Sequence, residues 1–198
     1  MKKILIPLLL CIALLLSLTA CFGGDSEPTV YERLNEHRSE DVERLSLSLT
    51  TVVSGETLAA RYDFAKTDSG VKIDYTYESL ATYDLASPAP LGDRVVTHRG
   101  SRTIDASGKT VAADGDEPNI PLGSPSFAGF DFSEGNFSEA KESEGSFSAK
   151  VKNAKTFCGV DGAENMTVSL THSDGKILSL TLGYEKDGAK ITAVYQTQ

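Results

Sequence analysis

The chain has 198 residues, with 19 basic and 28 acidic side chains and a formal net charge of −9. A surface with this acidic excess repels nucleic-acid phosphates and anionic lipid headgroups, so we expect no nucleic-acid partner and no electrostatic docking to a membrane. The length suits one domain. Its 8 Phe and 7 Tyr supply bulk for a core that lacks tryptophan.

The N-terminus has the pattern of an export signal. Two lysines precede an almost wholly apolar run, residues 4–16. This run is shorter than the roughly 20 residues that cross a bilayer as a helix, and the order of the two segments is typical of a secretory signal. Behind it stand four residues that resemble the lipobox of bacterial lipoproteins, Leu18-Thr19-Ala20-Cys21.

The resemblance implies cleavage between Ala20 and Cys21, diacylation of the Cys21 sulfur, and a protein anchored by lipid on the extracytoplasmic side of the cell membrane. Two acyl chains, at about 0.8 kcal/mol per buried methylene, anchor a protein durably. The alternative is an ordinary cleavable signal. Removal of residues 1–20 leaves 17 basic and 28 acidic side chains, a net charge of −11.

We expect a signal peptide at residues 1–20, a flexible tether at 21–28 that is rich in small and polar residues, and a domain from residue 29 onward. The domain begins with a helix. Thr29 and Glu32 have the spacing of a capping box, and apolar residues then recur every three or four positions. This pattern predicts a helix that starts near Val30 and ends between Arg38 and Arg44.

Two blocks of period-two alternation predict two antiparallel β-meanders, because alternation of apolar and polar residues is typical of strands with one buried face. Short turns that contain glycine join the strands within each block. The first block comprises residues 45–50, 58–64 and 71–77, and the second comprises residues 166–171, 178–184 and 189–195.

The centre of the chain, about residues 84–146, is rich in proline and glycine, and it is predicted to be mostly loop. Only Val95–His98 and Thr110–Val111 suggest short strands there. We therefore predict one mainly β (α+β) domain at residues 29–198, a bent antiparallel sheet of seven to ten strands with one N-terminal helix. By strand pattern alone, this architecture is similar to the half-barrel of lipoprotein carriers, which implies an apolar concavity under helices.

No motif predicts catalysis, a metal site or a cofactor, so we expect a non-enzymatic protein. Asp114, Asp116 and Glu117 are close in sequence, but the segment lacks the ligand ladder of an EF-hand. We interpret it as a solvated acidic turn. With Cys21 acylated, Cys158 has no partner for an internal disulfide, and we interpret it as an inert buried thiol.

Four phenylalanines lie close together among glycine and serine, at Phe127, Phe130, Phe132 and Phe137. They either fill the core beneath a long connection or line an apolar ligand groove. Two functions follow from these alternatives. The protein is a membrane-anchored, non-enzymatic module that binds an apolar ligand or an envelope partner, or it is a structural accessory lipoprotein with a solid core.

Overall fold

The computed structural model describes residues 27–81 and 95–198. These residues form ten strands, two α-helices and one 3-10 turn. In chain order the elements are α2 (Val30–His37), β1 (Arg44–Val53), β2 (Glu56–Thr67), β3 (Gly70–Leu80), β4 (Val95–Ile104), β5 (Thr110–Gly115), η1 (Glu134–Asn136), β6 (Phe137–Ser143), β7 (Ser146–Val151), α3 (Ala154–Cys158), β8 (Glu164–Ser173), β9 (Lys176–Lys186) and β10 (Ala189–Thr197).

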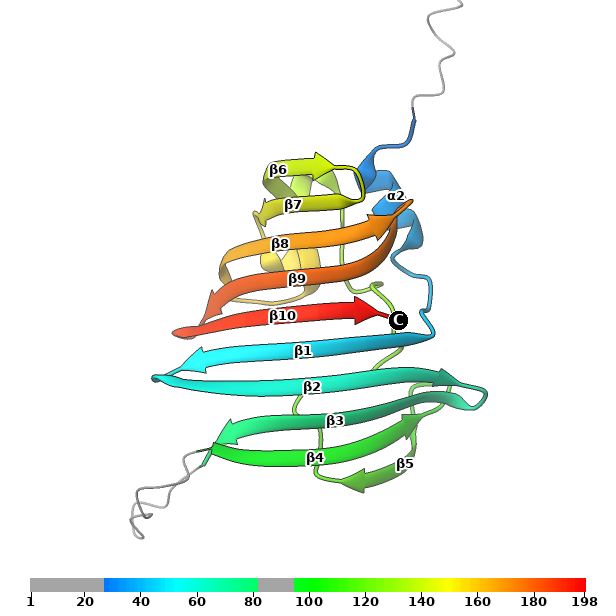
Figure 1. Ribbon diagram of the computed structural model, residues 1–198, viewed down its shortest axis with the longest axis vertical. Helices are drawn as coiled ribbons and strands as arrows, with labels where there is room; N and C mark the ends of the chain where they lie inside the picture. Colours follow the sequence, from blue (N-terminus) through cyan, green and yellow to red (C-terminus); the bar gives the residue numbers. More distant parts are fainter. Residues whose placement is uncertain (1–26, 82–94) are drawn as a thin grey trace, which may run out of the picture.

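All ten strands belong to one antiparallel sheet with the order β5-β4-β3-β2-β1-β10-β9-β8-β7-β6 (Figure 1). The predicted fold class is therefore confirmed. The two predicted meanders, β1-β2-β3 and β8-β9-β10, lie side by side because β1 pairs with β10, with Leu45 opposite Thr197. The longer α-helix, α2, precedes the first strand, as predicted.

Tight turns fix the register of both meanders. Ser54-Gly55 joins β1 to β2 with φ angles of 53° and 83°, Asp174-Gly175 joins β8 to β9 with 49° and 84°, and Asp187-Gly188 joins β9 to β10 with 51° and 76°. Positive φ at both central residues is the requirement of a type I′ hairpin, which explains the glycine in each turn.

The capping box of α2 forms as the sequence predicts. Glu32 N–H donates to Thr29 Oγ1 at 3.3 Å, and Thr29 N–H donates to Glu32 Oε2 at 2.7 Å. The helix ends at His37, with Arg38 as its C-cap. It buries Val30 and Leu34 beneath the sheet, and this apolar contact gives a helix of only eight residues the stability it would lack alone.

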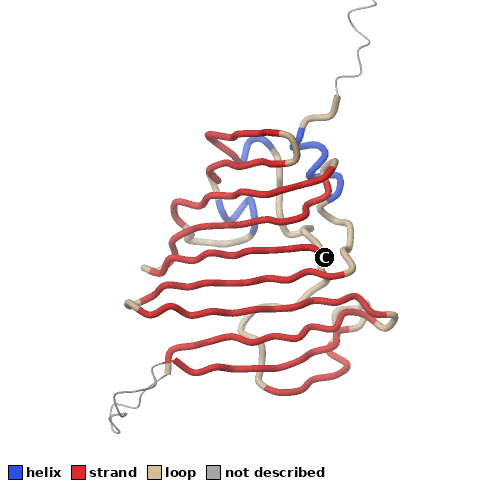
Figure 2. The backbone as a smooth tube through the Cα atoms, in the orientation of Figure 1, coloured by secondary structure: helices blue, strands red, loops and turns tan. Residues whose placement is uncertain are grey.

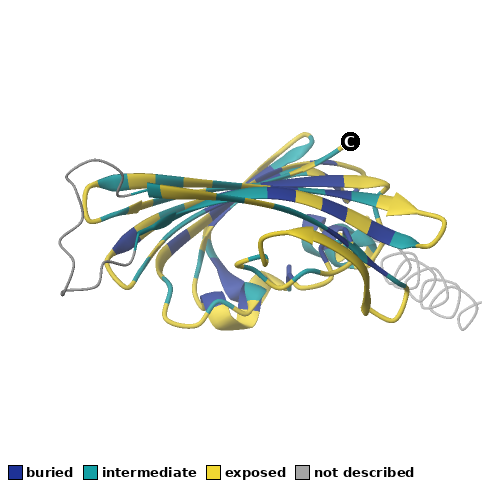
Figure 3. Ribbon diagram, turned by 90° about the horizontal axis from the view of Figure 1, so that it is seen from below, coloured by how far each residue is buried: buried dark blue, intermediate teal, exposed yellow. Residues whose placement is uncertain are grey.

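The core lies on one face of the sheet. Buried residues alternate along the strands, for example Met166, Val168 and Leu170 in β8. Seen edge-on, the sheet is a shallow arch with the helices and the long β5–β6 connection on its inner side (Figure 3). The tube in Figure 2 shows the same connection running from β5 across the sheet to β6. The outer face of the arch is open to solvent.

The centre of the chain is less loop-rich than predicted. β4 runs for ten residues, Val95–Ile104, where the sequence predicts a strand of four. Its inward positions include His98, Gly100 and Arg102, which break the hydrophobic alternation on which the prediction depends. The short helix α3 was not predicted. Residues 84–94 of the predicted loop lie outside the described residues.

Candidate binding site

The predicted cleavage and lipidation residues, Ala20 and Cys21, lie outside the described residues, so the lipid anchor stays a prediction. The structure does show where the described chain begins. α2 lies beside β6, at one edge of the sheet (Figure 1), where Arg33 of α2 is 3.5 Å from Glu142 of β6. In residues 27–81 and 95–198, no helix is long and apolar enough to cross a membrane.

The four predicted groove residues gather in one aromatic cluster beneath the C-terminal half of the sheet, and all are exposed by 7% or less. Phe157 of α3 is at the centre of the cluster. Its ring centroid lies 5.3–5.6 Å from those of Phe130, Phe132 and Phe137. Phe127 contacts Phe130 at 6.0 Å. Packing of ring edges on ring faces at these distances adds to the stabilisation from burial.

Hydrogen bonds hold the backbone of this cluster in place. The Asn35 side chain accepts from Phe132 N–H at 3.0 Å, and Phe157 O accepts from Asp131 N–H at 2.8 Å. The Arg38 guanidinium donates to Phe130 O. The segment is thus tied to α2 and to α3 as well as to the sheet. The apolar groove stays a prediction, and the effect of removing one of these rings on stability and on ligand binding tests it.

A second constellation covers the N-terminal half of the inner face. Three tyrosines on β2 and β3, here named the tyrosine row, stand side by side on this face: Tyr62, Tyr75 and Tyr77. Neighbouring ring centroids lie 5.6 Å and 6.5 Å apart. Burial raises the pKa of Tyr62 to about 12, and burial also raises the pKa of Tyr75. Both hydroxyls therefore stay protonated and able to donate at physiological pH.

The hydroxyls of the tyrosine row donate to residues 116–126, here named the strap, which follow β5 and have no helix or strand. Tyr75 donates to the carbonyl oxygen of Asp116, and Tyr77 donates to that of Glu117 at 2.7 Å. Tyr62 donates to the Asn119 side chain. A buried tyrosine needs a partner for its hydroxyl, and here the strap supplies all three.

Arg102 of β4 adds a buried positive charge to the row. Its guanidinium is 4% exposed and donates to the carbonyl oxygens of Asp114 at 2.6 Å and Asp116 at 2.8 Å. Its ionic partner is Glu117, 3.1 Å away and 88% exposed. Because a buried cation is costly without hydrogen bonds and an opposite charge, Arg102 depends on the strap for its stability.

Asp116 is also held by β4 and β3. Its carboxylate accepts from Arg99 N–H at 3.1 Å and lies 3.4 Å from His98 Nδ1. The other ring nitrogen of His98 shares a hydrogen bond of 3.0 Å with Ser79 Oγ, and the ring stacks on Tyr77. The order of contacts, serine to histidine to aspartate, is that of serine hydrolases.

The three carboxylates of the acidic turn do not point toward one common position. Asp116 contacts β4, Glu117 pairs with Arg102, and Asp114 lies opposite Ser101 on the outer face. Across the described ranges, no three His, Cys, Asp or Glu side chains are placed to share a metal ion.

Cys158 ends α3 with its thiol half-buried. Its Sγ donates to Ala154 O at 3.4 Å, and burial raises the pKa of the thiol. A thiol with a raised pKa is mostly protonated and thus a weak nucleophile.

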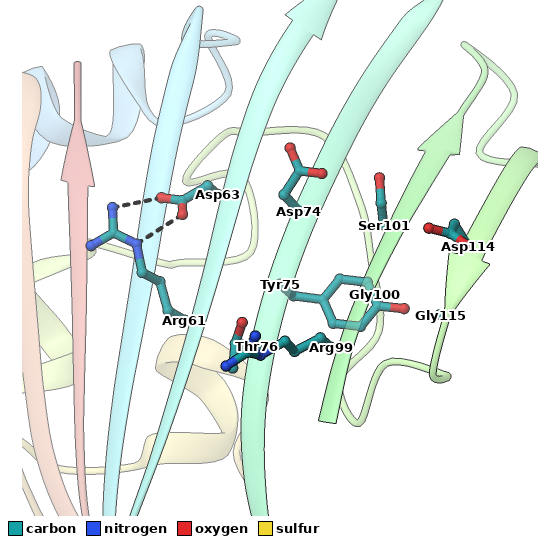
Figure 4. A pocket seen from close by; sticks show the side chains of 10 residues that line it. All are labelled: Arg61, Asp63, Asp74, Tyr75, Thr76, Arg99, Gly100, Ser101, Asp114 and Gly115. Carbon is teal, nitrogen blue, oxygen red and sulfur yellow. Dashed lines mark hydrogen bonds and ion pairs between the residues drawn. The ribbon is translucent and has the colours of Figure 1, made fainter. Parts of the chain in front are cut away.

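The outer face above the tyrosine row has a shallow depression lined by charged side chains (Figure 4). Arg61 makes two hydrogen bonds of 2.8 Å with Asp63, and these bonds hold the pKa of the Asp63 carboxyl below its usual value. Asp74 pairs with Lys72 at 2.8 Å. Since these carboxylates already have partners on the same face, we do not assign this depression a function.

The sequence contains a pattern from which the tyrosine row could have been predicted. Tyr62, Tyr75 and Tyr77 fall on the face that the alternation predicts as buried, and a buried phenol requires an acceptor. Three such residues on neighbouring strands indicate a polar segment above them. The sequence does not indicate which segment this is, because the strap follows Tyr77 by about 40 residues.

Comparisons with known proteins give little further guidance. No protein-family model and no curated protein matches the chain. Among solved structures, the crystal structure of LprF from Mycobacterium bovis is similar over 84% of this chain and 90% of that chain, with 11% sequence identity and a TM-score of 0.37. A similarity at this level does not define a role for this chain.

The packing of the aromatic cluster makes a quantitative prediction. Phe132→Ala should lower the free energy of unfolding by about 3–5 kcal/mol, because a fully buried phenyl ring is lost from a packed core. Leu178→Ala, at a position that is 48% exposed, should cost less than about 1 kcal/mol. Urea denaturation measures both. A loss of only about 1 kcal/mol for Phe132→Ala, with weakened binding of a hydrophobic dye, would instead establish the groove.

Proposed function

We propose that the protein is a bacterial lipoprotein anchored to the cell membrane through Cys21, and that its domain binds an envelope partner without catalysing a reaction. The lipobox resemblance supports the anchor. The geometry of the domain supports the binding function, because α2, where the described chain begins, lies beside the β6 edge (Figure 1), whereas the first strap residues contact β4, β3 and β2 in the other half of the sheet.

The observation that carries the proposal is the difference between the two halves of the inner face. The C-terminal half is closed by packed phenylalanine rings, whereas the N-terminal half is closed by a strap held through hydroxyl and guanidinium donors. The apolar surface of phenyl rings that pack on one another is already buried. The polar donors of the other half are satisfied by the strap, whose own residues are mostly exposed and form a polar surface of the kind that a polar partner can recognise.

Position strengthens the argument. β5 and β6 are the two edges of the sheet, nine strand spacings apart. At about 4.8 Å per spacing, this is roughly 43 Å along the arch. The first residues of the strap contact β4, β3 and β2, which lie six to eight of these spacings from β6, so a lipid tether that enters beside β6 leaves them accessible to an envelope partner.

The second candidate is a structural accessory lipoprotein with a solid core, and the tightness of the aromatic cluster favours it. The two candidates differ in what they predict at the strap. A binding module has a partner there, and a purely structural domain does not.

Site-specific cross-linking in the native host tests the binding function. We expect a photo-cross-linking amino acid at the exposed position Pro121 in the strap to yield a discrete adduct with another envelope protein. The same residue at Lys176, an exposed position whose Nζ lies 3.3 Å from Glu40, just after α2, should not form that adduct. Absence of any adduct at Pro121, or the same adducts at both positions, would favour the structural alternative.

The anchor has its own test. Cys21→Ala should abolish acylation and leave an uncleaved precursor or a protein released into the medium, because no sulfur remains to accept the lipid. Metabolic labelling with a fatty acid and fractionation with a carbonate wash measure this. A matured variant that stays in the washed membrane would show that the lipobox interpretation is wrong.

The absence of catalysis is tested at Ser79. We expect no labelling by a fluorophosphonate probe, although Ser79, His98 and Asp116 are in contact. Ser79 lies within β3 opposite Val96 of β4, and N–H groups of paired strands lie in the plane of the sheet, where they cannot form an oxyanion hole above the serine. Labelling that disappears in both Ser79→Ala and His98→Gln would overturn the non-enzymatic proposal.

A further inference from the structure

The tyrosine row and Arg102 bind the strap mainly through its main chain. The acceptors are the carbonyl oxygens of Asp116 and Glu117 in the strap, with that of Asp114 at the end of β5 beside them. Two contacts involve side chains, those of Glu117 and Asn119. Carbonyl oxygens are present in every polypeptide, so most of these contacts do not depend on which residues the bound segment carries.

The floor of this site is shaped for a backbone. A Cβ atom on Gly100 would lie 2.4 Å from Tyr75 Oη and 2.7 Å from Asp116 O, so the glycine allows the strap to approach β4 closely. The wall on one side is the Tyr75 ring, with the Arg102 guanidinium 5.7 Å from the ring centroid. The hydroxyl donors of Tyr75, Tyr77 and Tyr62 meet acceptors along one stretch of chain, residues 116–119, an arrangement that fits an extended segment.

The charge of the site selects for a carboxylate. Arg102 is buried, and its ionic partner Glu117 reaches it from solvent. A segment that replaces the strap must restore both the carbonyl acceptors and a negative charge, because an unmatched buried guanidinium is strongly unfavourable. The net charge of −11 after residue 20 opposes a highly acidic ligand, so a single carboxylate in an otherwise neutral segment fits best.

We propose that the tyrosine row, Gly100 and Arg102 form a binding site for an extended polypeptide segment that carries one carboxylate, and that the strap occupies this site within the chain as a competitor. The inference rests on the proposed function, since it names the partner class and the place of binding. It also implies that the site is available to a partner only in the fraction of molecules whose strap is displaced, which lowers the apparent affinity by that fraction.

An end-capped synthetic peptide of residues 116–122 with asparagine at the position of Asp116, so that the equivalent of Glu117 is its single carboxylate, tests the inference, with the full-length protein in detergent and fluorescence anisotropy as the readout. The double variant Glu117→Gln, Asn119→Ala weakens the strap but leaves the row intact, and it should bind the peptide at least about 10-fold more tightly than the parent. Adding Tyr75→Phe and Tyr77→Phe to that variant should reverse the gain. The matched control, Tyr184→Phe with Tyr195→Phe, changes two tyrosines outside the row and should leave the gain intact.

Charge recognition is tested in the same assay. A peptide with glutamine in place of the glutamate equivalent to Glu117 should bind about 5-fold more weakly, because it does not neutralise Arg102. No binding by the strap-weakened protein at about 1 mM peptide would overturn the inference. Binding that is unaffected by the Tyr75→Phe and Tyr77→Phe changes would overturn it equally, since the peptide would then bind elsewhere.

A second measurement uses the parent protein and does not depend on whether the variants fold. Asp116 N–H donates to Arg99 O at 2.8 Å, so displacement of the strap by excess peptide should speed hydrogen exchange at this amide. Unchanged exchange at saturating peptide would refute displacement. An envelope adduct at Pro121 without peptide binding would remove this inference alone, whereas peptide binding without an adduct would remove only the proposed envelope partner.

Discussion

The structure depends on one constraint, that a single open sheet has two faces and only one of them can tolerate water. Ten strands place residues such as Ile73, Val168 and Leu180 on the inner face, and no second sheet packs against them in the part of the chain that the structure describes. The inner face must therefore be covered by helices and connecting segments of the same chain. α2, α3, the phenylalanine cluster and the strap together provide it, and every candidate site in the molecule is a consequence of how they do so.

The sequence predicted the parts of the fold that depend on local rules. Alternation through Leu45, Leu47 and Leu49 follows from the period of a strand, the Asp-Gly pairs follow from the φ angles of tight hairpins, and Thr29 with Glu32 follows from the unsatisfied N–H groups of a helix start. Each of these signals lies within a few residues of the structure it determines. The lipobox falls outside the described residues, and its role stays a prediction.

The candidate site was not predictable for a physical reason. Its members come from β2, β3, β4 and the strap, and pairing between strands brings them together across dozens of residues. Arg102 is an example, since an arginine in a strand normally indicates an outward position. Here it points inward because backbone carbonyls and Glu117 satisfy it. The phenylalanines were recognised as a group from their spacing, but their contacts with Phe157 depend on the position of α3.

The central position of β10 has a consequence for how the protein reaches its folded state. Strands β1 and β9 flank β10 and do not pair with each other, so until residues 189–197 are available the two meanders have no hydrogen-bonded connection. The sheet is therefore completed by contacts of high sequence separation, which form slowly.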